Sequence, residues 1–153
     1  YYFLHLINNF FLSEKINLHK YYIIDFGCGY GRVFKFFEFK FKKFIGIDIN
    51  KKYINHLKTK YKSDYFINTD LRNYKKIIKK LNALTKNKKK ILYFYEPFED
   101  ALVRKIAKSC LRSGDKCIIV NIRNFNVLKS FKTLYKKILG EKSKNILIIK
   151  LPK

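Results

Sequence analysis

The sequence has no tryptophan and no methionine, and its 153 residues include only two prolines, three cysteines and six glycines. Because position 1 is not methionine either, we expect a truncated N-terminus. No stretch approaches the roughly 20 apolar residues that span a bilayer, and no segment has the pattern of a signal peptide. We therefore expect a soluble, cytoplasmic protein without a membrane-spanning segment.

Cysteine is too scarce and too widely spaced to build a disulfide framework or a zinc site. The three residues are Cys28, Cys110 and Cys117, an odd number without C-x-x-C spacing. We expect them to be small buried apolar side chains. The three histidines lie outside every motif described below, so the sequence predicts no metal site.

Acidic residues are scarce as well: 11 stand against 35 basic ones, for a formal net charge of +24. Such a charge is typical of nucleic-acid binding. However, only five of the basic residues are Arg, the residue that reads phosphate and base edges best. The dominant types (Lys, Asn, Ile, Phe and Tyr) share AT-rich codons. The charge therefore leaves nucleic acid open as a partner without establishing it.

Short apolar runs alternate regularly with amphipathic segments. The apolar runs lie at 21–26, 43–48, 64–67, 90–95 and 116–122, and the amphipathic segments at 31–39, 51–61, 71–84 and 98–111. This alternation predicts right-handed βαβ units on a parallel sheet with helices on both faces. Segments 130–139 and 144–152 are too close in sequence for a crossover helix, so we expect an antiparallel β-hairpin there.

The first residues form a separate expectation. Residues 2–12 read as a helix that packs on the edge of the sheet, with its aromatic side chains in the core. We expect residues 1–19 to be an N-terminal helical segment and residues 20–153 to be the cofactor-binding domain.

Three of the six glycines stand at positions 27, 29 and 31, where a strand becomes a helix. In an open α/β sheet, ligands bind at the carboxyl ends of the strands, near the switch in strand order. Glycine allows a tight turn and close approach of the backbone to a ligand, and the next helix offers free amide donors. The pattern predicts a site for a nucleotide-like cofactor with an anionic group; a bare tight turn is the alternative.

The spacing decides between cofactors. A dinucleotide fingerprint needs glycine at position 32, which is Arg, and no G-K-[ST] follows for a phosphate-binding loop. Asp25 would repel a pyrophosphate but suits a ligand with an ammonium or sulfonium group. Asp25 and Arg32 thus argue against a nicotinamide oxidoreductase.

With these residues the chain resembles class I S-adenosylmethionine (SAM) dependent methyltransferases. Asp25-x-Gly27-x-Gly29-x-Gly31 resembles the first motif of that family, and the resemblance implies the following cofactor-binding residues: Asp25, Phe26, Gly27, Cys28, Gly29, Gly31, Asp48, Ile49, Asp70, Leu71 and Glu96. It also implies a Rossmann-like α/β fold, with a seven-stranded, mostly parallel sheet flanked by helices and a C-terminal antiparallel β-hairpin.

Two acids that follow the glycines have roles in this resemblance. Asp48 matches the acid that takes both ribose hydroxyls, because two carboxylate oxygens suit a vicinal diol. Asp70, with Leu71 beside it, matches the position that holds the adenine amino group. Alternatively, Asp48 or Asn50 caps the helix at 51–61, and Asp70 caps the helix at 71–84.

The segment Glu96-Pro97-Phe98 ends the fourth strand, where the family meets the methionine end of the cofactor and the substrate. Enzymes that methylate base amines carry Asp/Asn/Ser-Pro-Pro-aromatic there; this chain keeps an acid, one proline and an aromatic residue. Glu96 and Phe98 are our candidate catalytic residues, and Phe98 could instead be a core residue at a helix start.

The sequence therefore predicts a SAM-dependent methyltransferase that transfers a methyl group to an unidentified acceptor, which is a protein side chain, a nucleic acid or a small molecule. With no metal cluster visible, metal-dependent catechol-type chemistry is disfavoured. The alternative is a basic nucleic-acid-binding module on a methyltransferase-like scaffold with weak or no catalysis. Tyr30 is expected to be a surface residue. Arg32 is either a surface residue as well or the partner of a carboxylate near the site.

Overall fold

The computed structural model describes residues 2–62, 65–85, 88–95, 99–111, 117–122, 135–139 and 146–150. The helices are α1 (Tyr2–Ser13), α2 (Arg32–Phe36), α3 (Lys51–Tyr61), α4 (Tyr74–Thr85) and α5 (Asp100–Leu111), with 3₁₀ turns η1 (Leu18–Lys20) and η2 (Leu71–Asn73). The strands are β1 (Tyr21–Phe26), β2 (Lys43–Asp48), β3 (Phe66–Asn68), β4 (Lys89–Tyr95), β5 (Cys117–Ile122), β6 (Tyr135–Leu139) and β7 (Ile146–Lys150).

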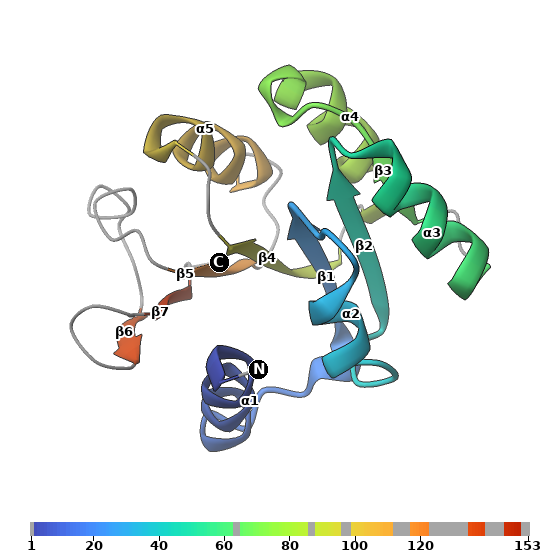
Figure 1. Ribbon diagram of the computed structural model, residues 1–153. Coiled ribbons are helices and arrows are strands. Elements are labelled where there is room, and N and C mark those ends of the chain that lie inside the picture. Colours follow the sequence, from blue (N-terminus) through green and yellow to red (C-terminus); the bar gives the residue numbers. More distant parts are fainter. Residues whose placement is uncertain are drawn as a thin grey trace.

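The strands form one sheet in the order β3-β2-β1-β4-β5-β7-β6 (Figure 1). The pairs from β3 to β5 are parallel, and β7 pairs antiparallel with both β5 and β6. The chain moves from β1 toward one edge through β2 and β3, then returns to β4 on the other side of β1. The switch in strand order thus lies between β1 and β4, where ligands of such sheets bind. The expected α/β fold, with a parallel sheet between helices, is confirmed.

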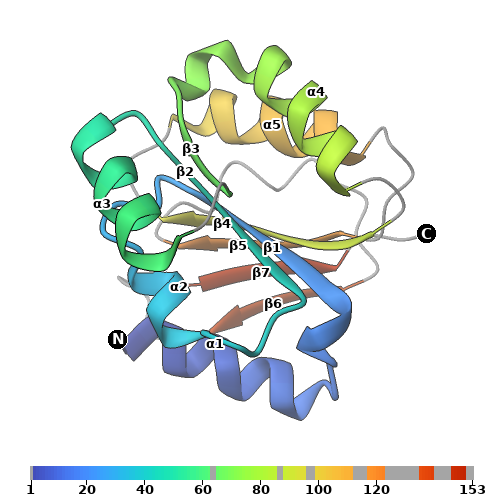
Figure 2. The ribbon, with the colours of Figure 1, turned by 90° about the vertical axis from the view of Figure 1, so that its right-hand side faces the viewer.

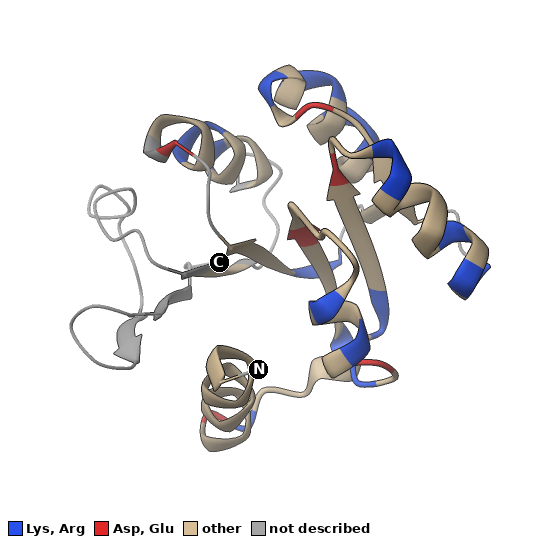
Figure 3. Cartoon of the chain, in the orientation of Figure 1, with Lys and Arg blue, Asp and Glu red and all other residues tan. Residues whose placement is uncertain are grey.

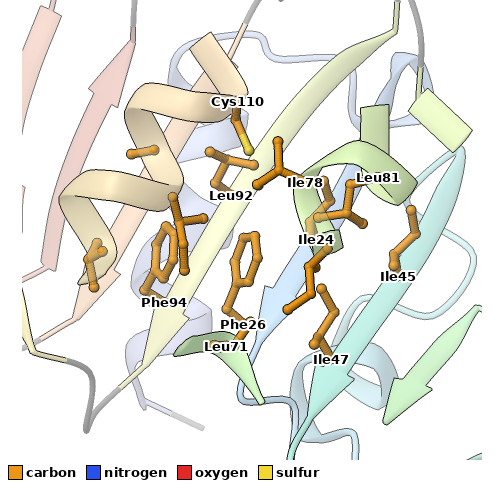
Figure 4. Packing of buried hydrophobic residues seen from close by; sticks show 14 of the residues in the cluster. Ile24, Phe26, Ile45, Ile47, Leu71, Ile78, Leu81, Leu92, Phe94 and Cys110 are labelled. Carbon is orange, nitrogen blue, oxygen red and sulfur yellow. The ribbon is translucent and has the colours of Figure 1, made fainter. Parts of the chain in front are cut away.

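One face of the sheet is covered by α4 and α5 (Figure 2). Alternate residues of the strands, such as Ile24, Ile45 and Leu92, point to this face and are fully buried. The rings of Phe26 and Phe94 stack there, with centroids 4.7 Å apart and planes 4° from parallel (Figure 4). This apolar layer fixes the register of β1 against β4, and so it fixes which residues meet at their ends.

The other face is covered by α1, α2 and α3. This corrects the expectation that the first helix packs on the sheet edge. The buried stripe of α1 contacts side chains of the central strands β1, β4 and β5; it consists of Leu4, Ile7, Phe10 and Phe11. A stripe at these spacings lies along one side of a helix and needs a wide apolar surface to bury it. The face of the sheet supplies that surface.

Several boundaries agree with the sequence, namely 21–26, 43–48 and 51–61. The third strand is displaced to Phe66–Asn68, and the segment 71–84 begins as the 3₁₀ turn η2. The segment expected over 31–39 is helical only to Phe36, because Phe37 is its C-cap and Phe39 has a φ of 66° that ends the helix. Among the described residues, no helix has both the length and the apolar character needed to cross a membrane.

Candidate functional site

A cavity of about 220 Å³ lies at the carboxyl ends of β1 and β4, at the switch in strand order. Four elements and the glycine loop line it with Tyr2, Phe3, Leu4, Asp25, Gly27, Cys28, Arg32, Val33, Tyr93 and Tyr95. Because this volume is below that of pockets for drug-sized ligands, roughly 300 Å³ or more, it suits one end of a nucleoside cofactor rather than the whole molecule.

Asp25 is the buried acid of this cavity. It is 1% exposed, and its Oδ2 has no hydrogen-bond partner. Burial, reinforced by the charge of Asp48, raises the pKa of Asp25 to about 8, although the nearby Arg32 charge lowers it. A buried carboxyl without a partner is costly when ionised, so at neutral pH Asp25 is largely protonated. A cation bound beside it would favour the ionised form.

Two further acidic groups that line this cavity, those of Cys28 and Tyr93, are held neutral. Burial raises the pKa of the Cys28 thiol, and the charges of Asp25 and Asp48 raise it further. Burial also raises the pKa of the Tyr93 hydroxyl, again with help from Asp25. Asp25 is therefore the group in this set whose charge changes near neutral pH.

The glycine loop uses a backbone conformation that other residues adopt only with strain. Gly27, Gly29 and Gly31 have φ angles of 79°, 51° and 73°. A Cβ built on Gly29 meets no atom within 4 Å, so this part of the loop faces open space. A Cβ on Gly31 would come within 2.7 Å of Leu57, so that glycine also lets the loop pack against α3. The loop combines a fixed turn with an open surface.

Asp48, at the end of β2, holds the glycine loop in place. Its Oδ2 accepts a hydrogen bond from the Gly29 amide at 2.9 Å, and its Oδ1 accepts one from the Asn50 amide at 2.8 Å. Asn50, and not Asp48, caps α3, since its side chain accepts from Lys52 and Tyr53. Each carboxylate oxygen of Asp48 keeps further acceptor capacity. Figure 3 shows acidic residues near the ends of the neighbouring strands β1 and β2.

Asp70 lies at the end of β3 and caps the 3₁₀ turn η2, as one reading of the sequence expected. Its Oδ1 accepts from the Arg72 amide at 2.9 Å, and its Oδ2 pairs with the Arg72 guanidinium. The hydrogen bonds from Arg72 hold the pKa of Asp70 below its usual range. The Thr69 amide donates to the Asp48 carbonyl at 3.0 Å, so the ends of β2 and β3 are tied together.

The predicted site residues thus fall into groups. Asp25, Gly27 and Cys28 meet in the cavity, and Gly29 joins Asp48. The Ile49 side chain is 63% exposed beside Asp48, whereas those of Phe26 and Leu71 are buried in the core under α4 and α5. Glu96 and Phe98 lie outside the described residues.

The sequence reasoning missed the aromatic wall of the cavity. Tyr93 and Tyr95 of β4 and Phe3 of α1 line it, and the Phe3 and Tyr95 ring centroids are 6.5 Å apart. A signal was present for the tyrosines, because Tyr95 directly precedes Glu96 and Tyr93 lies three positions before it. The register of β1 and β4 pairs Asp25 with Tyr93.

A comparison with protein families supports the reading of this site. Residues 24–82 match a family model described as "Methyltransferase domain". The match begins in β1, includes the glycine loop, Asp48 and Asp70, and ends in α4. A search of curated proteins finds no match.

Solved structures similar to this chain share its fold. A SAM-dependent methyltransferase from Anabaena variabilis has a TM-score of 0.66 at 12% identity, with 95% of this chain and 83% of that chain covered. An RNA methyltransferase from Salinibacter ruber, in complex with S-adenosyl-L-homocysteine, has 0.60 at 12%, covering 97% and 92%. Magnesium protoporphyrin IX methyltransferase from Synechocystis, with bound SAM, has 0.62 at 12%, covering 97% and 78%. Together with the family match, this fold confirms the resemblance to class I methyltransferases drawn from the sequence.

Proposed function

We propose that this protein is a SAM-dependent methyltransferase. The observation that carries the proposal is the glycine loop, with three positive φ angles, fixed by the carboxylate of Asp48 next to a cavity that contains the buried acid Asp25. The family match over residues 24–82 covers these same residues and supports the proposal.

The residues present suit the cofactor at both of its ends. Asp25 Oδ2 is buried without a partner, so it would accept the α-ammonium group of the methionine moiety. Asp48 would accept hydrogen bonds from the ribose hydroxyls, and the open side of Gly29 leaves room for the nucleoside to approach the backbone. Ile49 would give apolar contact to the adenine, and Asp70 would accept from its amino group.

SAM, when bound, supplies an activated methyl group on a sulfonium centre. The role of the chain's own residues is therefore to bind SAM, to align the acceptor with the methyl group and to exclude water. Tyr93 and Tyr95 would wall the region beside Asp25; in the sequence Glu96 follows Tyr95 directly and Phe98 comes two residues later. We propose that Glu96 accepts a proton from the methyl acceptor and that Phe98 packs against the same acceptor.

The acceptor is a separate question. The similar structures include an RNA methyltransferase and a magnesium protoporphyrin IX methyltransferase, so the shared fold does not choose between acceptors. We propose a planar group as the acceptor, because the described walls near Asp25 include the aromatic rings of Phe3, Tyr93 and Tyr95.

The test is calorimetric titration of the purified protein with S-adenosylhomocysteine (SAH), with NADH as the control. We expect saturable binding of SAH and none of NADH. Failure of SAH to bind the folded protein would refute the proposal. Binding of NADH instead would favour the nicotinamide reading.

A second candidate, nucleic-acid binding on a methyltransferase-like scaffold, rests on one basic groove. A cavity of about 640 Å³ next to α4 is lined by Arg72, Lys75, Lys76 and Lys80, together with Asn68 and Thr69. Basic residues also lie on α2, α3 and α5 (Figure 3), so the charge is not confined to this groove. This candidate is tested by measuring RNA binding over a range of salt concentrations for two double variants. A larger loss of affinity in Lys75→Gln/Lys76→Gln than in the control Lys58→Gln/Lys60→Gln on α3 would support a nucleic-acid site in this groove.

A further inference from the structure

Arg32 is a second charged residue in the cavity that holds Asp25. It is the first residue of α2, directly after the glycine loop, and its guanidinium carbon lies 5.8 Å from the centre of the Tyr95 ring. Both Arg32 and Tyr95 line the cavity, so the cation lies beside a residue of the cavity wall.

The Arg32 cation has no ion-pair partner among the described carboxylates. Among the described residues, an ion pair joins Arg72 to Asp70 near the end of β3, and it does not involve Arg32. Arg32 does act on Asp25 at longer range, since its charge lowers the pKa that burial raises. The Arg32 side chain is also exposed, so it can move to meet a ligand without breaking a packed contact in the core.

The cavity therefore offers a ligand one buried carboxyl, which ionises when a cation binds beside it, and one cationic group. The methionine end of SAM or SAH carries the matching pair, an ammonium and a carboxylate on the same carbon. Asp25 alone would attract the ammonium but repel the carboxylate beside it. A guanidinium, with its planar fork of donors, pairs with a carboxylate through two parallel hydrogen bonds.

We propose that Arg32 binds the α-carboxylate of the cofactor's methionine moiety, and so makes the cavity selective for a zwitterionic amino-acid group. This inference rests on the proposed function, because it takes SAM and SAH as the ligands. It assigns to Arg32 a role in binding that is distinct from its contact with Tyr95.

The experiment compares two ligands in two variants. SAH and 5′-methylthioadenosine share the nucleoside and the thioether sulfur, but only SAH has the amino-acid end. Their dissociation constants are measured by calorimetry for the unmodified protein, for Arg32→Gln and for Lys35→Gln. Lys35 is an exposed residue of the same helix that is not part of the cavity lining, so it controls for loss of charge on α2.

We expect Arg32→Gln to weaken SAH binding by on the order of tenfold or more, since a hydrogen-bonded charge pair is lost. Binding of 5′-methylthioadenosine should change by less than about twofold, and Lys35→Gln should leave both ligands close to the unmodified protein. Arg32→Lys, which keeps the charge but not the fork, should fall between Arg32→Gln and the unmodified protein.

Equal weakening of both ligands in Arg32→Gln, or no weakening of either, would overturn the inference while leaving the proposed function standing. An unmodified protein that binds neither ligand would overturn the proposed function itself. Thermal unfolding of Arg32→Gln, expected within a few degrees of the unmodified protein, separates loss of binding from loss of the fold.

Discussion

Asp25→Asn should stabilise the protein while impairing its site. In the folded chain Asp25 is buried, with its Oδ2 unpartnered, and its pKa is raised to about 8 from an ordinary value of 3.8. The folded state therefore holds a proton that the unfolded state has released at neutral pH. Asn has nearly the same shape and no charge, so it removes the cost of either protonating or burying the carboxylate.

The sign and size of the effect follow from proton linkage. Stability from this group is complete below about pH 4, where both states are protonated, and it falls as the pH rises until the folded carboxyl ionises near pH 8. Each pH unit in this window costs about 1.4 kcal/mol. The stability advantage of Asp25→Asn should therefore grow by on the order of 4 kcal/mol between pH 5 and pH 8 and level off above it.

The assay is urea unfolding of both proteins, followed by circular dichroism at pH 5, 6, 7, 8 and 9. The difference between the two proteins isolates Asp25, because other titrating groups are common to both. Asp48 and Arg32, whose charges act on Asp25, are unchanged. Asp70→Asn is the control: its carboxyl pKa is lowered by Arg72, so the difference it makes should be flat from pH 5 to pH 9. A flat or shrinking difference for Asp25→Asn would show that Asp25 is ionised in the folded protein and refute the reasoning.

The remaining predictions concern the loop and its anchor. Asp48→Ala should keep the fold but raise the SAH dissociation constant at least tenfold, because the ribose hydroxyls and the Gly29 amide both lose their acceptor. An unchanged dissociation constant by calorimetry would contradict a role of Asp48 in cofactor binding. Gly27→Val should abolish SAH binding, since a β-branched residue at a φ of 79° distorts the loop, and a normal titration would count against the loop assignment. Gly29→Ala should cost about 1–2 kcal/mol of stability by backbone strain, whereas Gly31→Ala should cost about 1–3 kcal/mol more because its Cβ meets the buried Leu57. Equal unfolding free energies for these two variants would show that Leu57 yields freely.

Local sequence patterns were sufficient for the elements that carry the cofactor motifs. The apolar run 21–26 and the run 43–48 became β1 and β2 with the expected bounds, and Asn50 starts α3 where a side-chain cap predicts it. The helix 31–39 was predicted too long because its apolar pattern continues past Phe36. The pattern does not record the left-handed conformation of Phe39 that turns the chain.

The convergence of side chains in the cavity was less accessible from the sequence. Asp25 and Arg32 are seven positions apart, but Tyr93 joins them only through the register of β1 and β4. Phe3 joins them only because α1 lies on the face of the sheet. Such contacts depend on tertiary packing, which an isolated segment does not determine.

The position of Phe3 offers an optical probe of the site. The chain has 12 tyrosines and no tryptophan, so a single indole introduced at any position would be its only one. Phe3 lines the cavity and faces Tyr95 with centroids 6.5 Å apart, and Phe3→Trp keeps an aromatic ring there. With excitation at the red edge of tyrosine absorption, its emission would report on the cavity alone. Binding of any candidate acceptor could then be followed in real time, without a labelled ligand or a coupled enzyme.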